Sequence, residues 1–175
     1  MAPPVLSFTP ATASDIPAIQ ALARKIWYAC YTEMISLEQI EYMLKRMYST
    51  EAIEKELAAG VFWELASYRG ETVGYVSCEF DKQTREVTLH KMYLLRELQG
   101  KGFGQQLLEQ VKRRARELEA ETITLRVNRH NEKAIKAYQR AGFAIARTNV
   151  ADIGGGFVMD DYILTCTLSQ NRRGE

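Results

Sequence analysis

Apolar side chains recur at helical spacing in the first third of the chain. Between residues 16 and 30 they follow a period close to 3.6, at Ile16, Ile19, Leu22, Ala23, Ile26, Trp27 and Cys30. Ser14 comes just before this stretch, and Pro17 lies in its first turn. This pattern is typical of a helix capped at Ser14. A second stripe follows a capping-box sequence that begins at Ser36, and consists of Leu37, Ile40, Met43, Leu44 and Met47. We expect two helices here and a shorter third over about 51–59, ended by Gly60.

The apolar period changes to two after Gly60. Residues 61–68, 72–80 and 85–95 are rich in β-branched and aromatic side chains, and the turn sequences RGE and DKQT separate them. They predict three antiparallel strands. A short strand is also expected before the helices, over 6–12.

A strand–helix–strand unit follows. One helix is expected from about residue 103, with an apolar face of Phe103, Leu107, Leu108, Val111, Ala115 and Leu118. A strand over 122–127, a helix over 131–141 and a strand pair over 143–150 and 160–168 complete the order, with a glycine loop at 153–156. This order predicts an α/β fold with a mixed sheet, in which the strands flanking the first of these helices run parallel.

Composition and charge exclude several classes of protein. The 175 residues favour one domain over 1–175, with a core over 6–168 and a polar tail over 169–175. A net charge of +1 indicates neither nucleic acid nor an anionic membrane as a partner. Three dispersed cysteines and two histidines predict neither a disulfide framework nor a metal site. With no signal-like start and no apolar run of membrane-spanning length, we expect a cytoplasmic protein.

Three glycines, Gly100, Gly102 and Gly104, occupy alternate positions directly before a predicted helix. Glycine costs a helix about 1 kcal/mol per position relative to alanine, so a compensating role is expected. The stretch lacks the Ser/Thr of a Walker A loop and the third glycine of a dinucleotide fingerprint. Two interpretations remain. One is a flexible turn, and the other is a cradle in which backbone N–H groups bind a pyrophosphate while Lys101 adds positive charge.

The segment from Gln99 to Gly104 resembles the Gln/Arg-x-x-Gly-x-Gly/Ala signature of the GNAT family of N-acetyltransferases. A second family motif is matched about thirty residues later by Asn131, Ala134, Tyr138, Gly142 and Phe143. The resemblance covers roughly 6–168, and the chain is more loosely similar to the spermidine/spermine-type N-acetyltransferases of bacteria. It implies a mixed, mostly antiparallel sheet with helices on both faces and a V-shaped splay between the fourth and fifth strands. Acetyl-CoA would lie in that splay as cosubstrate, and no metal is implied.

The resemblance also implies which residues hold acetyl-CoA. The pyrophosphate would be held in the loop of Gln99, Gly100, Lys101, Gly102, Phe103 and Gly104. Backbone groups of Met92 and Leu94 would pair with the pantetheine, and the N–H of Leu94 would polarise the thioester carbonyl. Asn131 and Lys133 would contact the coenzyme as well, although an asparagine at this position suits a helix cap equally well.

Acetylation of an amine requires proton transfers, because a free alkylamine titrates near ~10. The resemblance assigns the acid to Tyr138, close to the coenzyme sulfur; packing in the core is the alternative. Many family members carry a glutamate where this chain has Thr88. Alternation along the strand predicts that Glu86, Thr88, His90 and Met92 share a face, which makes His90 a candidate base. Glu79, on the neighbouring strand, is expected to bind a cationic substrate or to relay a proton.

The acceptor is expected to bind near Trp27, Tyr31 and Glu33, because aromatic rings with an acid suit an alkylammonium ion. Trp27 would equally suit the core, and Glu33 a solvated loop. The 153–156 loop, Asp152, Asp160 and Asp161 are further candidates for the edge of the pocket.

The favoured function is transfer of acetyl to a primary amine of a small, polyamine-like molecule. Direct attack in a ternary complex is expected, since neither motif contains a cysteine nucleophile. The alternatives are a protein or peptide N-acetyltransferase, and a non-catalytic acetyl-CoA-binding regulatory module. The resemblance is compatible with a homodimer.

Overall fold

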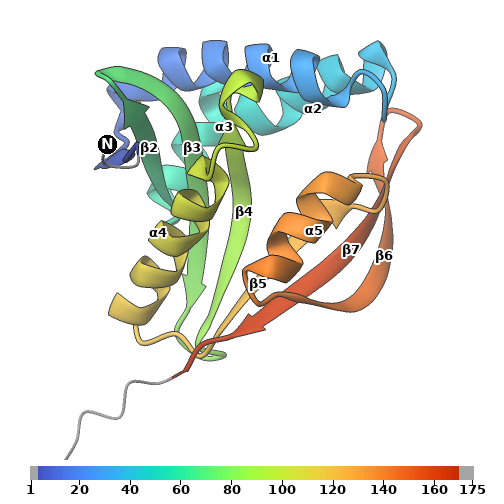
Figure 1. Ribbon diagram of the computed structural model, residues 1–175. Helices are drawn as coiled ribbons and strands as arrows, with labels where there is room; N and C mark the ends of the chain where they lie inside the picture. The colour runs from blue at the N-terminus through green and yellow to red at the C-terminus, as the bar shows by residue number, and fades with distance from the viewer. Residues whose placement is uncertain (1–3, 170–175) are drawn as a thin grey trace, which may run out of the picture.

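The computed structural model describes residues 4–169, which form one seven-stranded sheet and five α-helices (Figure 1). In chain order the elements are β1 (Ser7–Pro10), α1 (Ile16–Tyr31), α2 (Leu37–Tyr48), α3 (Thr50–Ala58), β2 (Phe62–Tyr68), β3 (Glu71–Asp81), β4 (Glu86–Leu94), α4 (Phe103–Glu117), β5 (Thr122–Asn128), α5 (Glu132–Arg140), β6 (Ala144–Gly154) and β7 (Phe157–Thr167). The strand order is β1-β2-β3-β4-β5-β7-β6, and every neighbouring pair is antiparallel except β4 and β5. The predicted mixed sheet, with parallel strands around α4, is confirmed.

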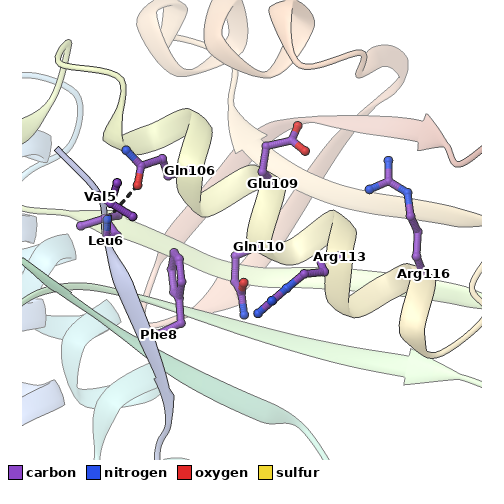
Figure 2. Close-up of a pocket in the computed structure, with 8 residues that line it drawn as sticks. All are labelled: Val5, Leu6, Phe8, Gln106, Glu109, Gln110, Arg113 and Arg116. Carbon is purple, nitrogen blue, oxygen red and sulfur yellow. Dashed lines mark hydrogen bonds between the residues drawn. The ribbon is translucent and has the colours of Figure 1, made fainter. Parts of the chain in front are cut away.

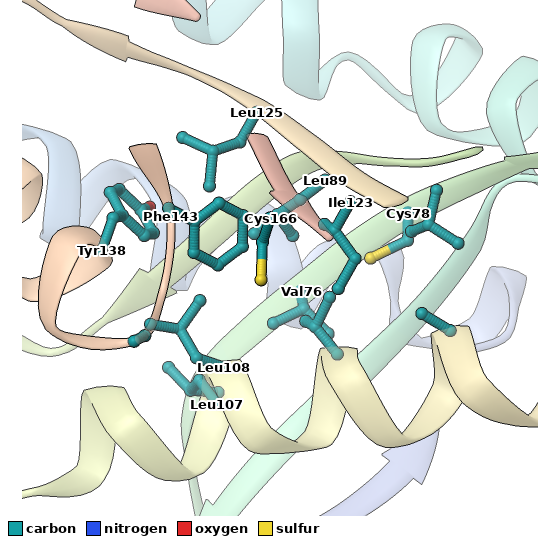
Figure 3. Close-up of a cluster of buried hydrophobic side chains, with 14 of the residues drawn as sticks. Val76, Cys78, Leu89, Leu107, Leu108, Ile123, Leu125, Tyr138, Phe143 and Cys166 are labelled. Atoms are coloured by element: carbon teal, nitrogen blue, oxygen red, sulfur yellow. The ribbon is translucent and has the colours of Figure 1, made fainter. Parts of the chain in front are cut away.

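Helices cover both faces of this sheet (Figure 1). On one face α4 and α5 bury an apolar cluster that includes Leu107, Leu108 and Ile123 (Figure 3). On the other face α1, α2 and α3 bury a second cluster, which includes Ile26, Ile40 and Trp63. Each fully buried side chain of this size contributes roughly 1.5–3 kcal/mol, so the two clusters hold the helices on their faces.

The parallel pair β4 and β5 is joined over only part of its length. The register runs from Glu86 opposite Thr122 to Leu89 opposite Leu125, and stops there. The remaining five residues of β4 therefore have no partner on this side of the sheet. Beyond that point β5 and β7 turn away from β4, as Figure 1 shows. The expected splay between the fourth and fifth strands is thus present.

Two predicted boundaries were wrong. Ser14 does not cap α1, because it lies inside a short 3₁₀ turn whose capping box is made by Thr12 and Asp15. The final strands are longer than predicted: they continue on both sides to Gly154 and Phe157 and leave only a two-residue glycine turn. Glycine predicts a loop by its local preference, but cross-strand hydrogen bonds override that preference at Gly154. The predicted cap at Ser36 is confirmed, since its hydroxyl accepts from the N–H of Gln39 at 3.1 Å.

Within residues 4–169, the helices are all too short or too polar to span a membrane. Apart from Ser169, the predicted polar tail lies outside the described residues.

Candidate active site

A cleft of about 1200 Å³ occupies the opening between β4 and β5. Thirteen of the residues predicted for the site line it: Trp27, Tyr31, Glu33, His90, Met92, Leu94, Gln99, Gly100, Gly102, Gly104, Asn131, Lys133 and Tyr138. Lys101, Phe103 and Glu79 are not among its lining residues. A shallower hollow of about 620 Å³ lies between the N-terminal segment and α4 (Figure 2), where Leu6 N–H donates to Gln106 at 2.8 Å. Because the predicted residues converge on the larger cleft, we place the candidate site there.

The glycine turn brings bare backbone to the mouth of the cleft. Gly100 and Gly102 have φ of +75° and +86°, which glycine adopts at little cost, and Gly102 caps α4. A Cβ added at Gly100, Gly102 or Gly104 would meet no atom within 4 Å. Gly104 is an ordinary helical residue, so neither backbone strain nor packing requires glycine there. The turn therefore leaves open space beside its glycines at the start of α4, where the first N–H groups of the helix have no partner within the helix and can bind an anion.

Phe103 takes part in this turn only through its backbone. Its side chain is buried in the core against Tyr68, with ring centroids 4.9 Å apart. Lys101 is exposed beside the turn. Gln99 holds the turn onto the end of β4, because its amide donates to the carbonyl of Leu94 at 3.1 Å and to Cys30 Sγ at 3.4 Å.

The edge of β4 that faces the cleft carries free N–H groups. Leu95 N–H donates to the carbonyl of Val73, in β3, at 2.9 Å. Because N–H directions alternate along a strand, those of Met92 and Leu94 point away from β3 and toward the cleft.

A β-bulge at His90 overturns the prediction that four residues of β4 share one face. Ser77 pairs with Lys91 while Cys78 pairs with Leu89, which leaves His90 as an extra residue. Met92 consequently packs in the cluster under α4, and Lys91 turns to the opposite face, where its Nζ lies 2.8 Å from Glu56 Oε1. Without the bulge this ammonium group would enter the apolar cluster, so the bulge gives the charge a partner.

The bulge also turns His90 outward to Glu79. His90 Nε2 lies 2.9 Å from Glu79 Oε2, and both side chains are partly exposed. Because a carboxylate only accepts hydrogen bonds, Nε2 carries the hydrogen and Nδ1 is the proton-accepting nitrogen of the neutral ring. His90 lines the cleft and Glu79 lies behind it.

Tyr138 projects from α5 into the apolar cluster at the cleft (Figure 3). It is 8% exposed, and its ring lies 5.8 Å from that of Phe143. Burial, with a smaller contribution from the nearby Tyr31 hydroxyl, raises the pKa of Tyr138 above its ordinary value. Within the described part of the chain its hydroxyl has no hydrogen-bond partner. The Tyr138 hydroxyl therefore stays protonated across the neutral pH range and is free to donate a hydrogen bond.

The beginning of α5 contributes a cap and a row of cations. The side chain of Asn131 accepts from the N–H of Ala134 at 3.3 Å, so the capping role is realised. Lys133, Lys136 and Arg140 all line the cleft. Only Lys133 was predicted, although the spacing of three and four residues places the three on one helix face. They surround the cleft with positive charge suited to phosphate groups.

Aromatic rings form the opposite wall. Trp27 is 2% exposed and stacks on Tyr31 at 4.7 Å and on Tyr93 at 5.7 Å. Trp27 belongs to the core and also lines the cleft. Burial raises the pKa of Tyr31 to about 12. Glu33 is exposed at the rim. Tyr93 was not predicted, because the bulge at His90 decides which way it points.

Hydrogen bonds from α2 to the β6–β7 hairpin bridge this end of the cleft. The Tyr42 hydroxyl donates to the carbonyl of Ile153 at 2.6 Å, Arg46 donates to the same carbonyl, and Gln39 donates to the carbonyl of Val158 at 3.2 Å. Of the acidic residues proposed for the pocket edge, Asp161 lines the cleft and Asp152 and Asp160 do not.

The chain shares its sequence pattern with known acetyltransferases. Residues 21–143 match the model of the acetyltransferase (GNAT) family. An uncharacterised N-acetyltransferase of Bacillus subtilis, YdgE, is 29% identical over 136 residues, which cover 76% of this chain and 83% of that protein. A 5-NmdU N-acetyltransferase of Pseudomonas phage PaMx11 is 29% identical over 109 residues, 62% of this chain and 72% of that protein.

Solved structures share the fold at lower identity. The PaiA N-acetyltransferase of Thermoplasma acidophilum, crystallised with coenzyme A, superposes with a TM-score of 0.79 at 20% identity, over 94% of this chain and 99% of that one. The ribosomal-protein-S18-alanine N-acetyltransferase of Escherichia coli gives 0.72 at 16% identity, over 98% and 99%. With its splayed sheet, its glycine turn before α4 and the match across most of its length, the chain belongs to the GNAT family of acetyltransferases.

Proposed function

We propose that this protein transfers the acetyl group of acetyl-CoA to a primary amine of a small cationic molecule, by direct attack in a ternary complex. The observation that carries the proposal is the opening between β4 and β5. It brings the bare glycine turn, the free edge of β4 and the Tyr138 hydroxyl to one cleft.

The residues present fit acetyl-CoA. The open space at Gly100, Gly102 and Gly104 accommodates a diphosphate against the N-terminus of α4. Lys133, Lys136 and Arg140 supply cations for further phosphate oxygens. When bound, the coenzyme supplies an activated thioester. The N–H groups of Met92 and Leu94 then bind the pantetheine arm like a strand edge, and the N–H of Leu94 polarises the thioester carbonyl.

Tyr138 is proposed to assist the departure of the sulfur. Its raised pKa keeps the hydroxyl protonated, so it donates a hydrogen bond as negative charge develops on the thiolate. An ordinary thiol titrates near ~8.5, below a tyrosine, so full transfer from the phenol alone would be uphill. As the C–N bond forms and the C–S bond breaks, the attacking nitrogen would give its proton to His90, and coenzyme A would leave as a thiolate hydrogen-bonded to Tyr138.

His90 is proposed to accept the proton of the amine, through Nδ1 and directly or by way of water. Glu79 orients the ring by accepting from Nε2 at 2.9 Å. His90 and Glu79 would together take the role of general base, which the family resemblance assigns to a glutamate at the position of Thr88.

A small acceptor is favoured over a peptide by the bridge between α2 and the β6–β7 hairpin. The hydrogen bonds of Tyr42, Arg46 and Gln39 close that end of the cleft, which limits the passage of an extended chain. A polyamine is our first choice of acceptor, because aromatic rings and acidic side chains at the acceptor end suit an alkylammonium ion.

The test is release of free thiol from acetyl-CoA across a panel of diamines, monoamines, aminoglycosides and peptide N-termini. We expect turnover with small cationic amines. Coenzyme binding without turnover on any amine would favour a regulatory module instead.

In the same assay, Tyr138→Phe should lower kcat by roughly 10²-fold or more while coenzyme A binding stays unchanged. Phenylalanine preserves the packing against Phe143, so a loss confined to kcat reports the hydroxyl. An unchanged rate would remove Tyr138 from the chemistry.

A further inference from the structure

Asp161 is a carboxylate that the fold buries at the acceptor end of the cleft without giving it a partner. It is 5% exposed and lines the cleft from β7. Its Oδ1 is buried and makes no hydrogen bond within residues 4–169. Burying such a group without a partner loses its hydration and destabilises the fold unless something compensates. An unsatisfied carboxylate oxygen in a cavity wall therefore points to a ligand that donates hydrogen bonds.

The strand register places Asp161 on the acceptor side of the sheet. Asp161 lies opposite Asn128 of β5, and residues directly opposite in an antiparallel pair share a face. Met159, two residues away on β7, packs against the cluster under α1 and α2. Tyr162, by contrast, packs in the cluster under α4 and α5. The carboxylate thus points to the side where the aromatic wall stands.

No internal cation neutralises this carboxylate. Among the described residues no Lys, Arg or His forms a salt bridge with Asp161. Arg126, on β5, lines the same cleft and favours the charged form of Asp161, but it is exposed and makes no salt bridge with the carboxylate. The neighbouring Asp160 pairs through Oδ2 with Arg129 at 3.3 Å, although its Oδ1 likewise makes no hydrogen bond within residues 4–169, and Asp160 does not line the cleft. Burial is the larger influence and raises the pKa of Asp161, as expected of a carboxylate awaiting a counter-charge.

The surroundings of Asp161 connect it to the reacting groups. Asp161, Tyr31 and Tyr138 all line the same cleft. Tyr31 also packs edge-on to Tyr93 at 6.3 Å. Asp161, Tyr31 and Tyr93 line the same cleft, and a carboxylate and aromatic rings in one cleft suit an ammonium group with an apolar stem, by ion pairing and cation–π attraction.

We propose that Asp161, together with the Tyr31 and Tyr93 rings that line the same cleft, forms the subsite that binds a non-reacting ammonium group of the acceptor, while another, neutral nitrogen attacks the thioester. This inference rests on the proposed function, because it assigns the acceptor to the same cleft. It specifies the acceptor as a cationic amine and gives the chain a specificity-determining residue. Neutral amines and alcohols of the same shape would leave the carboxylate unpaired and would bind more weakly.

The experiment uses n-butylammonium chloride and 1-butanol as probes, with coenzyme A bound and no acetyl donor present. Saturation-transfer NMR titrations give the two dissociation constants for the wild type, for Asp161→Asn and for Asp160→Asn. We expect the wild type to prefer the cation by roughly tenfold or more. Asp161→Asn should lose that preference, whereas the matched Asp160→Asn should keep it.

Two results would overturn the inference: a wild type that does not distinguish the cation from the alcohol, or an Asp161→Asn variant that retains the full preference. Coenzyme A binding by Asp161→Asn would show that the variant is folded. If the variant does not fold, the wild-type preference for the cation over the alcohol still tests the inference. Because neither probe titration involves acetyl transfer, the result is separate from the thiol-release test of the proposed function. Turnover of amines with an unchanged preference in Asp161→Asn would leave the function standing and remove only this subsite.

Discussion

At the scale of single residues, the proposed chemistry depends on side chains whose environments differ sharply. Tyr138 is surrounded by apolar groups and stays protonated, whereas His90 is partly exposed and hydrogen-bonded to a carboxylate. One site therefore holds a persistent donor, the Tyr138 hydroxyl, and an imidazole with a proton-accepting nitrogen, Nδ1 of His90.

His90→Gln tests the proposed base. Glutamine keeps a donor toward Glu79 but cannot accept a proton, so kcat should fall by roughly 10²-fold while coenzyme A binding is unchanged. Glu79→Gln should cost less, about tenfold, because it removes only the orientation of the ring. Steady-state rates over pH 6–9 provide the measurement. If His90→Gln keeps the wild-type kcat at every pH, the amine loses its proton to another group.

At the scale of elements, three irregularities create the site. The bulge in β4 turns His90 toward Glu79, the early end of the β4–β5 register opens the cleft, and the glycines before α4 leave its N-terminus bare. The bulge and the early end of the β4–β5 register interrupt strand hydrogen bonds, and the glycines lower the helix propensity at the start of α4. Each also lies where the proposed function needs an exposed side chain or an exposed N–H group.

Gly104→Ala should separate stability from function. Alanine is the better helix former and its Cβ would meet no atom within 4 Å, so unfolding should become harder by about 0.5–1 kcal/mol. The same methyl group would occupy the space assigned to the diphosphate, so coenzyme A affinity should fall about tenfold or more. Thermal unfolding without ligand and calorimetric titration of coenzyme A measure the two effects. A more stable variant with unaltered affinity would show that the diphosphate does not bind at this turn.

The glycine turn of the β6–β7 hairpin offers a matched pair of variants. Gly155 and Gly156 both have positive φ, +62° and +79°, so alanine strains the backbone at either position by about 1–2 kcal/mol. Only at position 155 would the Cβ clash, at 2.9 Å from the ring of Tyr42.

Gly155→Ala should therefore lose about 1–2 kcal/mol more stability than Gly156→Ala, and it should also raise the KM for the amine by loosening the bridge from α2. Melting temperatures would differ by roughly 2–6 °C in a chain of this size. Equal melting temperatures would mean that Tyr42 gives way easily and that the bridge is not rigid.

At the scale of the whole molecule, the periodic patterns of apolar residues correctly predicted the helices, the strands and their buried faces. The apolar stripe that starts at Ile16 and the alternating runs that became β2, β3 and β4 decide what is buried, and burial decides the fold. The glycine turn and Tyr138 line the cleft, and the sequence could single them out because each belongs to a motif of fixed local spacing. By contrast, the bulge at His90 is linked to a long-range ion pair, because it turns Lys91 toward Glu56, thirty-five residues away along the chain. The unpaired state of Asp161 likewise depends on strands brought together only by folding. No local pattern encodes such long-range pairings.

Alkaline pH should destabilise this protein steeply, because tyrosines are concentrated in its interior. Burial is the main cause that raises the pKa of Tyr48, Tyr75 and Tyr138 above the ordinary value of 10, and the first two share a hydrogen bond of 2.8 Å. Their contribution to stability is fully present below pH 10. Above it the unfolded chain ionises while the folded chain does not, so stability falls as pH rises through and beyond 10.

The expected slope is about 1.4 kcal/mol per pH unit for each such tyrosine, or roughly 4 kcal/mol for the three together. Urea unfolding at pH 8, 9, 10 and 11 measures it, and absorbance at 295 nm reports tyrosinate. In the folded protein the buried phenols should ionise only together with unfolding. A stability that stays flat from pH 9 to 11, or ionisation of all nine tyrosines without loss of structure, would mean that water reaches these rings in the folded state.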